Sequence, residues 1–305
     1  MSEKLERPNW IRVPASVSRG FTETLNVIKE AGVHTVCEEA MCPNIGECWR
    51  NKTATFLIMG DTCTRNCGFC NVKHGRPAPL DDDEPIKVAQ SVQKLGIKYA
   101  VITCVTRDDI KDGGAQHFAN VIKAIRDLNP GTKVEILTSD LRGNTNAIKI
   151  VVDAQPDVFG HNLEVVRKYH KQVKRPPADY DVSLNFLKTV KKISPQIITK
   201  TGIMVGVGET KEDVFELIDD VVNVDVDILT IGQYLPPSSS HHPIARYVTP
   251  EEFAEYAEYG KSHGVEVIAG ALVRSSYKAR EVYDLVQGGK NIARPFYNAV
   301  QRRGC

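Results

Sequence analysis

The chain has 305 residues, enough for one large α/β domain or two ordinary ones, and 42% of them are hydrophobic and 25% charged, which is typical of soluble globular proteins. A formal net charge of +1 gives no argument for binding to nucleic acid or to a membrane surface, and no apolar run is long enough for a membrane span. The first ten residues are partly acidic and lack an apolar segment, so we expect no targeting signal and a cytoplasmic location.

Six short segments rich in Val, Ile and Leu are predicted to be strands, and most are followed by a helical pattern. They are Thr55–Met59, Lys98–Thr103, Lys133–Thr138, Asp157–Gly160, Ile197–Val205 and Val226–Ile231. Helix starts with acidic first turns are predicted at Asp83, Thr210 and Thr249. Strands that alternate with helices imply parallel βαβ units, so the predicted fold class is α/β, a partial parallel (β/α)6 TIM-type barrel.

The predicted barrel covers residues 55–270, with an N-terminal extension of residues 1–54 and a C-terminal extension of residues 271–305. Chemistry in such barrels collects on the loops that follow the strands. The strand predicted at Ile197–Val205 is polar in its middle, so Lys200 is expected to face a cavity. The stretch after Ser276 is predicted to be helical and then basic, with Cys305 as a free thiol on a flexible end.

The eight cysteines are unevenly distributed, because six of them lie between residues 37 and 70. In a protein without an export signal, cysteines are expected to be reduced, so metal binding explains them better than disulfides do. Cys104, at the end of a predicted strand, is expected to be a small buried residue.

The loop after the first predicted strand carries Cys63, Cys67 and Cys70 in a C-x3-C-x2-C pattern. Three thiolates on one loop suit a 4Fe–4S cluster and leave one iron without a protein ligand. That iron can chelate S-adenosylmethionine and pass an electron into its sulfonium, which yields a 5′-deoxyadenosyl radical. The motif, with Phe69 before its last cysteine, resembles that of radical S-adenosylmethionine enzymes. A zinc knot is the alternative, but structural zinc takes four ligands.

A second motif, C-x4-C-x5-C, places Cys37, Cys42 and Cys48 in the N-terminal extension. It again offers three thiolates, and a zinc site or buried thiols are the alternative interpretation. This pair of motifs, in this order, resembles the lipoyl synthase family. Further matching blocks extend over roughly residues 10–280: Thr106–Ala115, Glu135–Asp140, Pro156–Glu164, Ala178–Tyr180, Lys200–Thr210, Leu229–Pro236, His242–Val248 and the Arg-Ser-Ser-Tyr motif at Arg274–Tyr277.

The resemblance implies two 4Fe–4S clusters. The auxiliary cluster would be bound by Cys37, Cys42, Cys48 and a serine of the Arg-Ser-Ser-Tyr motif, with Ser276 preferred over Ser275. A serine is a weaker ligand for iron than a thiolate, which suits a cluster that must be opened. In the family the auxiliary cluster donates its sulfides to the substrate, and Ser276 would act in catalysis by releasing the cluster.

The implied reaction is the insertion of two sulfur atoms at C6 and C8 of a protein-bound octanoyl chain, with two molecules of S-adenosylmethionine. An unactivated C–H bond has no useful acidity, so a carbon radical rather than acid–base catalysis must break it. Implied partners are an octanoylated lipoyl-carrier protein or domain, a ferredoxin- or flavodoxin-type electron donor and a cluster-repair carrier. Another radical sulfur-inserting enzyme, such as biotin synthase, and a non-catalytic zinc or iron–sulfur module are the alternatives.

Several residues are predicted to bind S-adenosylmethionine, each with a structural alternative. Asn162 and Glu164 are candidates for the ribose hydroxyls, or else belong to a helix N-cap. Gly206 and Gly208 would let the backbone approach the cofactor, or else serve only a tight turn. Phe69 is expected beside the cofactor. Less specific candidates are the loop at Arg107, Asp108, Asp109 and Gly113, the basic stretch 167–175, which is either a carrier-docking or a solvated surface, and the loop at His241 and His242.

Overall fold

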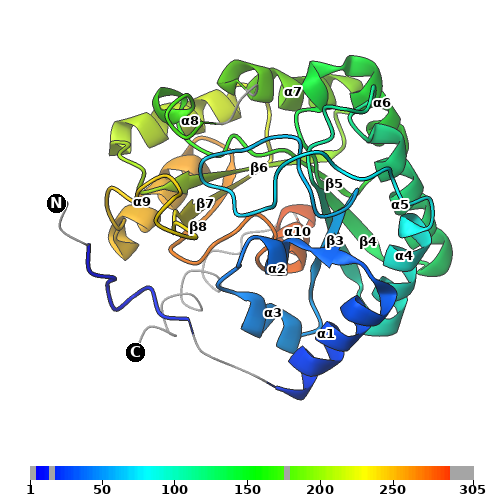
Figure 1. Ribbon diagram of the computed structural model, residues 1–305. Helices are drawn as coiled ribbons and strands as arrows, with labels where there is room; N and C mark the ends of the chain where they lie inside the picture. The colour runs from blue at the N-terminus through cyan, green and yellow to red at the C-terminus, as the bar shows by residue number, and fades with distance from the viewer. Residues whose placement is uncertain (1–4, 14–17, 175–178, 289–305) are drawn as a thin grey trace.

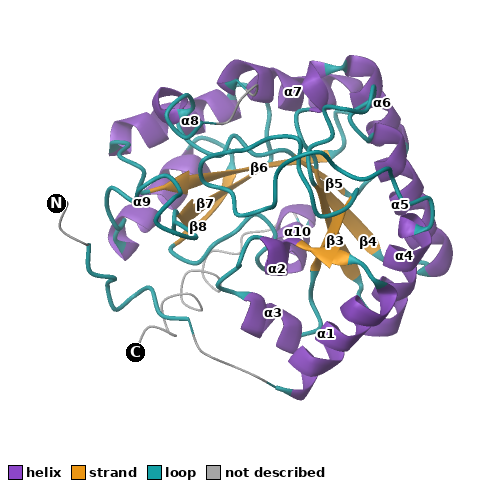
Figure 2. Cartoon of the chain, in the orientation of Figure 1, coloured by secondary structure: helices purple, strands orange, loops and turns teal. Residues whose placement is uncertain are grey.

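The computed structural model describes residues 5–13, 18–174 and 179–288, and it contains one sheet of eight strands in the order β1 to β8. The strands are β1 (His34–Thr35), β2 (Thr55–Ile58), β3 (Tyr99–Cys104), β4 (Lys133–Leu137), β5 (Val158–Gly160), β6 (Ile198–Val205), β7 (Ile228–Gln233) and β8 (Glu266–Gly270). Neighbours from β2 to β8 are parallel, whereas β1 pairs with β2 in the antiparallel sense. No pairing joins β8 to β1, so the sheet is an unclosed barrel (Figure 2).

Helices precede, separate and follow the strands, and most of them cover the outer face of the sheet (Figure 1). In chain order they are α1 (Arg19–Ala31), α2 (Val36–Glu39), α3 (Ile45–Arg50), α4 (Glu84–Leu95), α5 (Ala115–Leu128), α6 (Thr145–Asp153), α7 (Tyr180–Ile193), α8 (Lys211–Val222), α9 (Pro250–Ser262) and α10 (Ala279–Gln287), with short 3₁₀ turns at Leu141–Gly143 and Arg167–Tyr169. The helices α4 to α9 follow the strands β2 to β7 in alternation and form an arc around them. No helix in the described ranges is long and apolar enough to cross a membrane.

The six predicted strands are confirmed as β2 to β7, and they form the predicted partial barrel of parallel βα units. Two strands were not predicted. The strand β1 has two residues, and β8 has only Val267 and Ile268 as β-branched members, too little for a strand signal. Residues 289–305, with the predicted basic tail and Cys305, lie outside the described residues.

Two of the predicted helix starts are reciprocal capping boxes. The Thr210 side chain accepts from the Asp213 amide while the Asp213 carboxylate accepts from the Thr210 amide, and Thr249 and Glu252 pair in the same way. At α4 the N-cap Asp83 makes no side-chain cap bond. The capping boxes at Thr210 and Thr249 fix where the loops after β6 and β7 end and the following helices begin.

The barrel interior is filled with side chains at the end where the parallel strands begin. Side chains of β3, β5, β6, β7 and β8 form one apolar cluster there with α10. Within this region Lys200 Nζ donates to Glu135 Oε1 at 2.8 Å, and Tyr99 Oη donates to the other carboxylate oxygen at 2.6 Å. Lys200 therefore points inward as predicted, but it meets a buried ion pair instead of a cavity, because both side chains are only 3% exposed.

Replacing one member of this pair should destabilise the protein strongly. In Lys200→Met the Glu135 carboxylate stays buried without its counter-charge, and we expect a loss of about 3–5 kcal/mol. The double change Lys200→Met with Glu135→Gln should recover much of that loss, since the amide still accepts from Tyr99. Denaturant unfolding of the cluster-free protein measures both, and equal losses for the single and double variants would contradict this account.

Candidate iron–sulfur centres

The loop that carries Cys63, Cys67 and Cys70 begins at a fixed turn after β2. Met59 and Gly60 both have positive φ, 70° and 88°, and the buried Glu84 carboxylate accepts from the Met59 amide at 2.7 Å. The same carboxylate contacts His117 Nε2 at 2.6 Å, and Arg107 donates to the Met59 carbonyl at 3.3 Å. These buried polar contacts satisfy the turn and set the direction in which the cysteine loop leaves the strand.

The Cys63 sulfur already sits among hydrogen-bond donors. The backbone amides of Thr106 and Arg65 lie 3.3 Å and 3.4 Å from Sγ and donate to it. The Cys63 backbone is held by a 2.8 Å bond from its amide to the Lys73 carbonyl and a 2.9 Å bond from the Gly75 amide to its carbonyl. Amides that point at a sulfur stabilise a thiolate, which is the form that binds iron.

Arg65, inside the cysteine loop, is the residue that ties the loops together, and the sequence analysis did not single it out. Its guanidinium donates twice to Asp108 and twice to Asp140, at 2.7–2.8 Å. Burial by itself would raise the pKa of Asp140, but the hydrogen bonds and charge of Arg65 outweigh it and lower that pKa to about 2. A buried, bidentate arrangement of this kind holds loops after β2, β3 and β4 in one geometry.

The far end of the cysteine loop packs on two other loops. The Gly68 amide donates to the Val173 carbonyl at 2.9 Å, and a Cβ at Gly68 would lie 2.8 Å from that oxygen, so the position requires glycine. The His242 amide donates to the Gly68 carbonyl at 2.7 Å, and His241 Nε2 lies 3.2 Å from the Cys70 carbonyl. The predicted loop at His241 and His242 therefore packs on the cysteine loop itself.

Phe69 and Glu164, two predicted cofactor contacts, lie close to this end of the loop. Phe69 packs against an apolar cluster of Val165, Val173, Val207 and Tyr234. Burial raises the pKa of Cys70 to about 11, with smaller contributions from the charges of Glu164 and Cys63. Glu164 has a φ of 71°, which is uncommon for a residue other than glycine. Its backbone pairs with β6: its amide donates to the Gly202 carbonyl at 3.0 Å and its carbonyl accepts from the Met204 amide at 2.7 Å.

Asn162 lies inside the barrel mouth rather than at a helix start. Its Oδ1 accepts a hydrogen bond from the Ser275 hydroxyl at 3.1 Å. Both atoms crowd Gly202 of β6, where a Cβ would meet them at 3.0 and 2.9 Å. No α-helix follows directly, so the helix-cap alternative for Asn162 is wrong. Glycine at position 202 is what lets the C-terminal segment enter the barrel mouth.

Gly206 and Gly208 each have a structural requirement of their own. Their φ angles are 96° and 124°, and a Cβ would lie 2.1 Å from Gln233 Nε2 at the first and 2.6 Å from Tyr169 Oη at the second. The buried Glu209 carboxylate accepts from three successive amides, those of residues 206, 207 and 208. The Gly206 carbonyl accepts from the Ala245 amide and the Gly208 carbonyl accepts from the Tyr169 hydroxyl, so contacts within the protein account for this turn.

The other three clustered cysteines lie on and between α2 and α3. Burial raises the pKa of Cys37 to about 11 and that of Cys48 to about 12, and the neighbouring thiols contribute to both shifts. These mutual effects show that Cys37, Cys42 and Cys48 lie together. Thr55 and Trp49 lie close enough to this sulfur to oppose the rise of the Cys37 pKa, and the buried Trp49 indole N–H has no hydrogen-bond partner among the described residues.

Two hydrogen bonds fasten the C-terminal segment to this cysteine group. Asn44 Nδ2 donates to the Leu272 carbonyl at 2.7 Å, and Tyr277 Oη donates to Glu47 at 3.3 Å. Between them lies Ser276, which lines the same cavity as Cys48. Ser275 points elsewhere, because its hydroxyl is bonded to Asn162.

Arg274 is a second residue whose position the sequence analysis did not foresee. Burial lowers the pKa of its guanidinium, and the charge of Cys42 acts in the opposite direction. Its Nη1 donates to the Val273 carbonyl at 2.7 Å and would lie 3.2 Å from a Cβ at Gly232. The only prior signal was its place in the Arg-Ser-Ser-Tyr motif.

The donor geometry fits clusters better than single metal ions. Among the described residues, no three His, Cys, Asp or Glu side chains converge closely enough to hold one ion. A zinc site needs such convergence, whereas in a 4Fe–4S cluster each thiolate binds a different iron. Cys104 ends β3 and is half-buried rather than fully buried as predicted. Desolvation nevertheless raises its pKa to about 12, and the neighbouring Cys63 adds to that rise.

Comparisons with known proteins agree with this geometry. A family model described as the radical SAM superfamily matches residues 57–221. A curated protein of Caldicellulosiruptor saccharolyticus named lipoyl synthase is 50% identical over 282 residues, which cover 92% of this chain and 99% of that protein. Methylornithine synthase (PylB) has a TM-score of 0.53 at 12% identity, over 95% of this chain and 94% of its own. The FeFe-hydrogenase maturase HydG from Carboxydothermus hydrogenoformans has a TM-score of 0.55 at 10% identity, over 88% and 78%.

The family model spans more than half of the chain and includes the Cys63–Cys70 loop, so the protein is a radical SAM enzyme, a class that uses a 4Fe–4S cluster and S-adenosylmethionine. Within this class the chain belongs to the lipoyl synthase family, as its identity over almost the whole length of a curated member shows. The resemblance predicted from the cysteine motifs is confirmed. The two solved structures, at low identity, support the fold alone.

The raised thiol pKa values predict slow alkylation of the cluster-free protein near neutral pH. Because the thiolate is the nucleophile, a pKa of about 11 at Cys37 and Cys70 leaves fewer thiolates at mildly alkaline pH than an exposed cysteine has. Alkylation at both should therefore keep accelerating between about pH 8 and pH 11, beyond the ordinary cysteine pKa near 8.5. Peptide mass spectrometry after timed iodoacetamide treatment measures this, and a plateau near pH 9 would contradict it.

Proposed function

We propose that this protein inserts two sulfur atoms, at C6 and C8, into a protein-bound octanoyl group and so forms the lipoyl group. The observation that carries the proposal is Ser276, which lines the same cavity as Cys48 although more than two hundred residues separate them. Family membership supplies the reaction, and the serine beside the second cysteine group supports a second cluster. When bound, the two clusters and S-adenosylmethionine would supply the electron, the radical and the sulfur.

The chain's own residues prepare the first centre. Cys63, Cys67 and Cys70 are the proposed ligands of the radical cluster, and Arg65 holds their loop against Asp108 and Asp140. This bracing keeps the loop in place, because breaking it leaves a buried carboxylate without a partner.

For S-adenosylmethionine we propose contacts from Phe69, Asn162 and Glu164, and from the backbone at Gly206 and Gly208. Phe69 lies beside the loop in its apolar cluster, and Glu164 is close enough to influence the Cys70 thiol. The Asn162 side chain, already engaged by Ser275, links this region to the Arg-Ser-Ser-Tyr segment. An aromatic face, hydrogen-bonding side chains and an open glycine turn are together suited to a nucleoside with an amino acid end.

At the second centre we propose that four residues bind the auxiliary cluster: Cys37, Cys42, Cys48 and Ser276. We call these four residues the auxiliary site. Arg274, buried near Cys42, would balance the negative charge that thiolates and sulfides bring there. Ser276 would be the ligand that dissociates from its iron when the cluster is opened, since a serine oxygen binds iron less strongly than a thiolate does.

The proposed partners follow from this chemistry. The substrate is an octanoyl-lysine on a lipoyl-carrier protein or domain, and the electron comes from a ferredoxin- or flavodoxin-type donor. A cluster-repair carrier would restore what the reaction consumes. Within the basic stretch, Arg167 pairs with Asp181 and Asp220, and Lys168 pairs with Asp213, so these two charges are already compensated.

A single-turnover experiment tests the function directly. The protein, loaded with clusters anaerobically, is given an octanoylated carrier peptide, S-adenosylmethionine and a reductant. Mass spectrometry should show a gain of two sulfur atoms on the peptide. S-adenosylmethionine cleavage without any sulfur gain would contradict the proposal.

Two cysteine variants separate the centres. Cys67→Ala should abolish S-adenosylmethionine cleavage, whereas Cys42→Ala should retain cleavage and lose sulfur insertion. Iron analysis should give about eight irons per chain in the wild type and about four in each variant, as two 4Fe–4S clusters require. Lipoyl formation by Cys42→Ala would overturn the donor role.

The neighbouring serines provide a matched pair of variants. Ser276→Ala removes a proposed iron ligand, so iron at the auxiliary site should be lost faster to a chelator and its spectroscopic signature should change. Ser275→Ala leaves that ligand in place and removes the bond to Asn162, so it should weaken S-adenosylmethionine binding while iron retention stays at the wild-type level. The reverse pattern would assign the ligand role to Ser275.

A further inference from the structure

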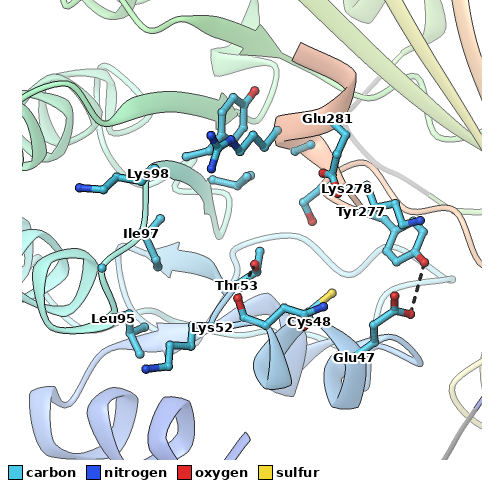
Figure 3. Close-up of a pocket in the computed structure, with 17 residues that line it drawn as sticks. Glu47, Cys48, Lys52, Thr53, Leu95, Ile97, Lys98, Tyr277, Lys278 and Glu281 are labelled. Atoms are coloured by element: carbon cyan, nitrogen blue, oxygen red, sulfur yellow. Dashed lines mark hydrogen bonds between the residues drawn. The ribbon is translucent and has the colours of Figure 1, made fainter. Parts of the chain in front are cut away.

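A cavity of about 400 Å³ opens beside the auxiliary site, far more than the roughly 30 Å³ that one water takes in the liquid. Its walls are α3 with the turn after it, the turn that precedes β3, and the chain from Ser276 into α10 (Figure 3). The Cys48 sulfur points into this space, and on one side the wall is closed by the bond between Tyr277 and Glu47.

The cavity approaches the auxiliary site from the opposite end of the barrel to the radical cluster. It is lined by residues 51–53, which precede β2, and by Leu95–Lys98, which precedes β3. The Cys63–Cys70 loop instead follows the C-terminal end of β2. A molecule that enters through the cavity therefore reaches Cys48 and Ser276 without passing the cysteine loop of the radical cluster.

The lining suits small ions of both signs. Glu47 and Glu281 lie close enough to Cys48 for their charges to act on its thiol, and carboxylates are ligands for ferrous ion. Lys98, an exposed residue of the lining, brings an ammonium group that attracts anions, whereas the ammonium group of Lys52 is already paired with Glu23 at 2.9 Å.

We propose that this cavity is the passage by which ferrous ion and hydrosulfide leave the auxiliary site for solvent, with Ser276 as the ligand that opens it. The inference rests on the proposed function, because a cluster that gives up its sulfur must be cleared of its remaining iron and sulfide before a carrier can restore it, whereas the radical cluster is retained. Exit toward the strand N-termini lets the auxiliary site be emptied while the network of Arg65 stays closed.

Filling the cavity tests the passage without measuring lipoyl formation. In a Cys63→Ala, Cys67→Ala, Cys70→Ala chain the only iron belongs to the auxiliary site, and its loss to excess EDTA is followed by iron analysis. Thr53→Trp and Asn51→Trp each place a ring in the cavity from exposed positions. Iron loss must then wait for a local opening of the structure, so we expect its rate constant to fall by roughly tenfold or more.

Two control variants separate the effect of the ring in the cavity from the effect of the substitution itself. Thr53→Ser leaves the cavity open, and Thr22→Trp adds a ring at an exposed threonine of α1 outside it. Both should lose iron at the rate of the unmodified chain. Equal rates in all four variants would overturn the passage. A triple-alanine chain that binds no iron would also overturn the passage, because the second cluster itself would then be absent. The iron content measured before the chelator is added identifies that case.

The wild-type chain gives an independent readout. In the cluster-free protein, access through the cavity predicts that Cys48 is alkylated faster than Cys37, because Cys48 lines the cavity and Cys37 is only 7% exposed. Faster alkylation of Cys48, which the ring at Thr53→Trp removes, supports the passage, and faster alkylation of Cys37 contradicts it.

Discussion

The structure depends on one constraint: its sheet does not close. The edge strand β1 contributes two residues, and among the described residues no further strand lies beside β8. Such a seam leaves edge groups and inner-face side chains to be covered by other parts of the chain. The segments α1 to α3 and 271–287 lie at this opening (Figure 1), fastened by the bonds from Asn44 to Leu272 and from Tyr277 to Glu47. Cysteines from one end of the chain and a serine from the other meet there for that reason.

The two centres are held by different kinds of interaction. Around Cys63 the loop is braced by Arg65 and its two carboxylate partners, the buried Asp140 and the half-buried Asp108, an arrangement that is costly to open. Around Cys48 the contacts are single hydrogen bonds, and a cavity reaches the thiol. A braced centre suits a cluster that is kept through many turnovers. A centre that is open to a cavity suits a cluster that is taken apart. The opening in the sheet thus corresponds to the cluster that the proposed reaction consumes.

Much of the barrel could be predicted because its signals are local. The strands β2 to β7 are short runs of branched apolar residues, and Thr210 and Thr249 cap the helices that follow two of them. The prediction was incomplete where tertiary contact decides the outcome. The sequence of β8 is too short to stand out, and Lys200 could be placed on the inner face but not beside Glu135, which lies 65 residues earlier. Glycines at 206 and 208 suggested a ligand, yet Gln233 and Tyr169 also require them.

The sequence by itself determined the class of chemistry, because the spacing of Cys63, Cys67 and Cys70 within one loop is a local property that suits a cluster with an open iron. It also determined the family, through Cys37 to Cys48 and the Arg-Ser-Ser-Tyr motif. The resemblance preferred Ser276 as the ligand, but only the tertiary structure shows where each serine lies. Ser275 and Ser276 are chemically alike and adjacent, and they differ because Gly202 admits the first toward Asn162 while the chain turns the second toward Cys48. That choice depends on packing between segments far apart in the chain, which no local pattern records.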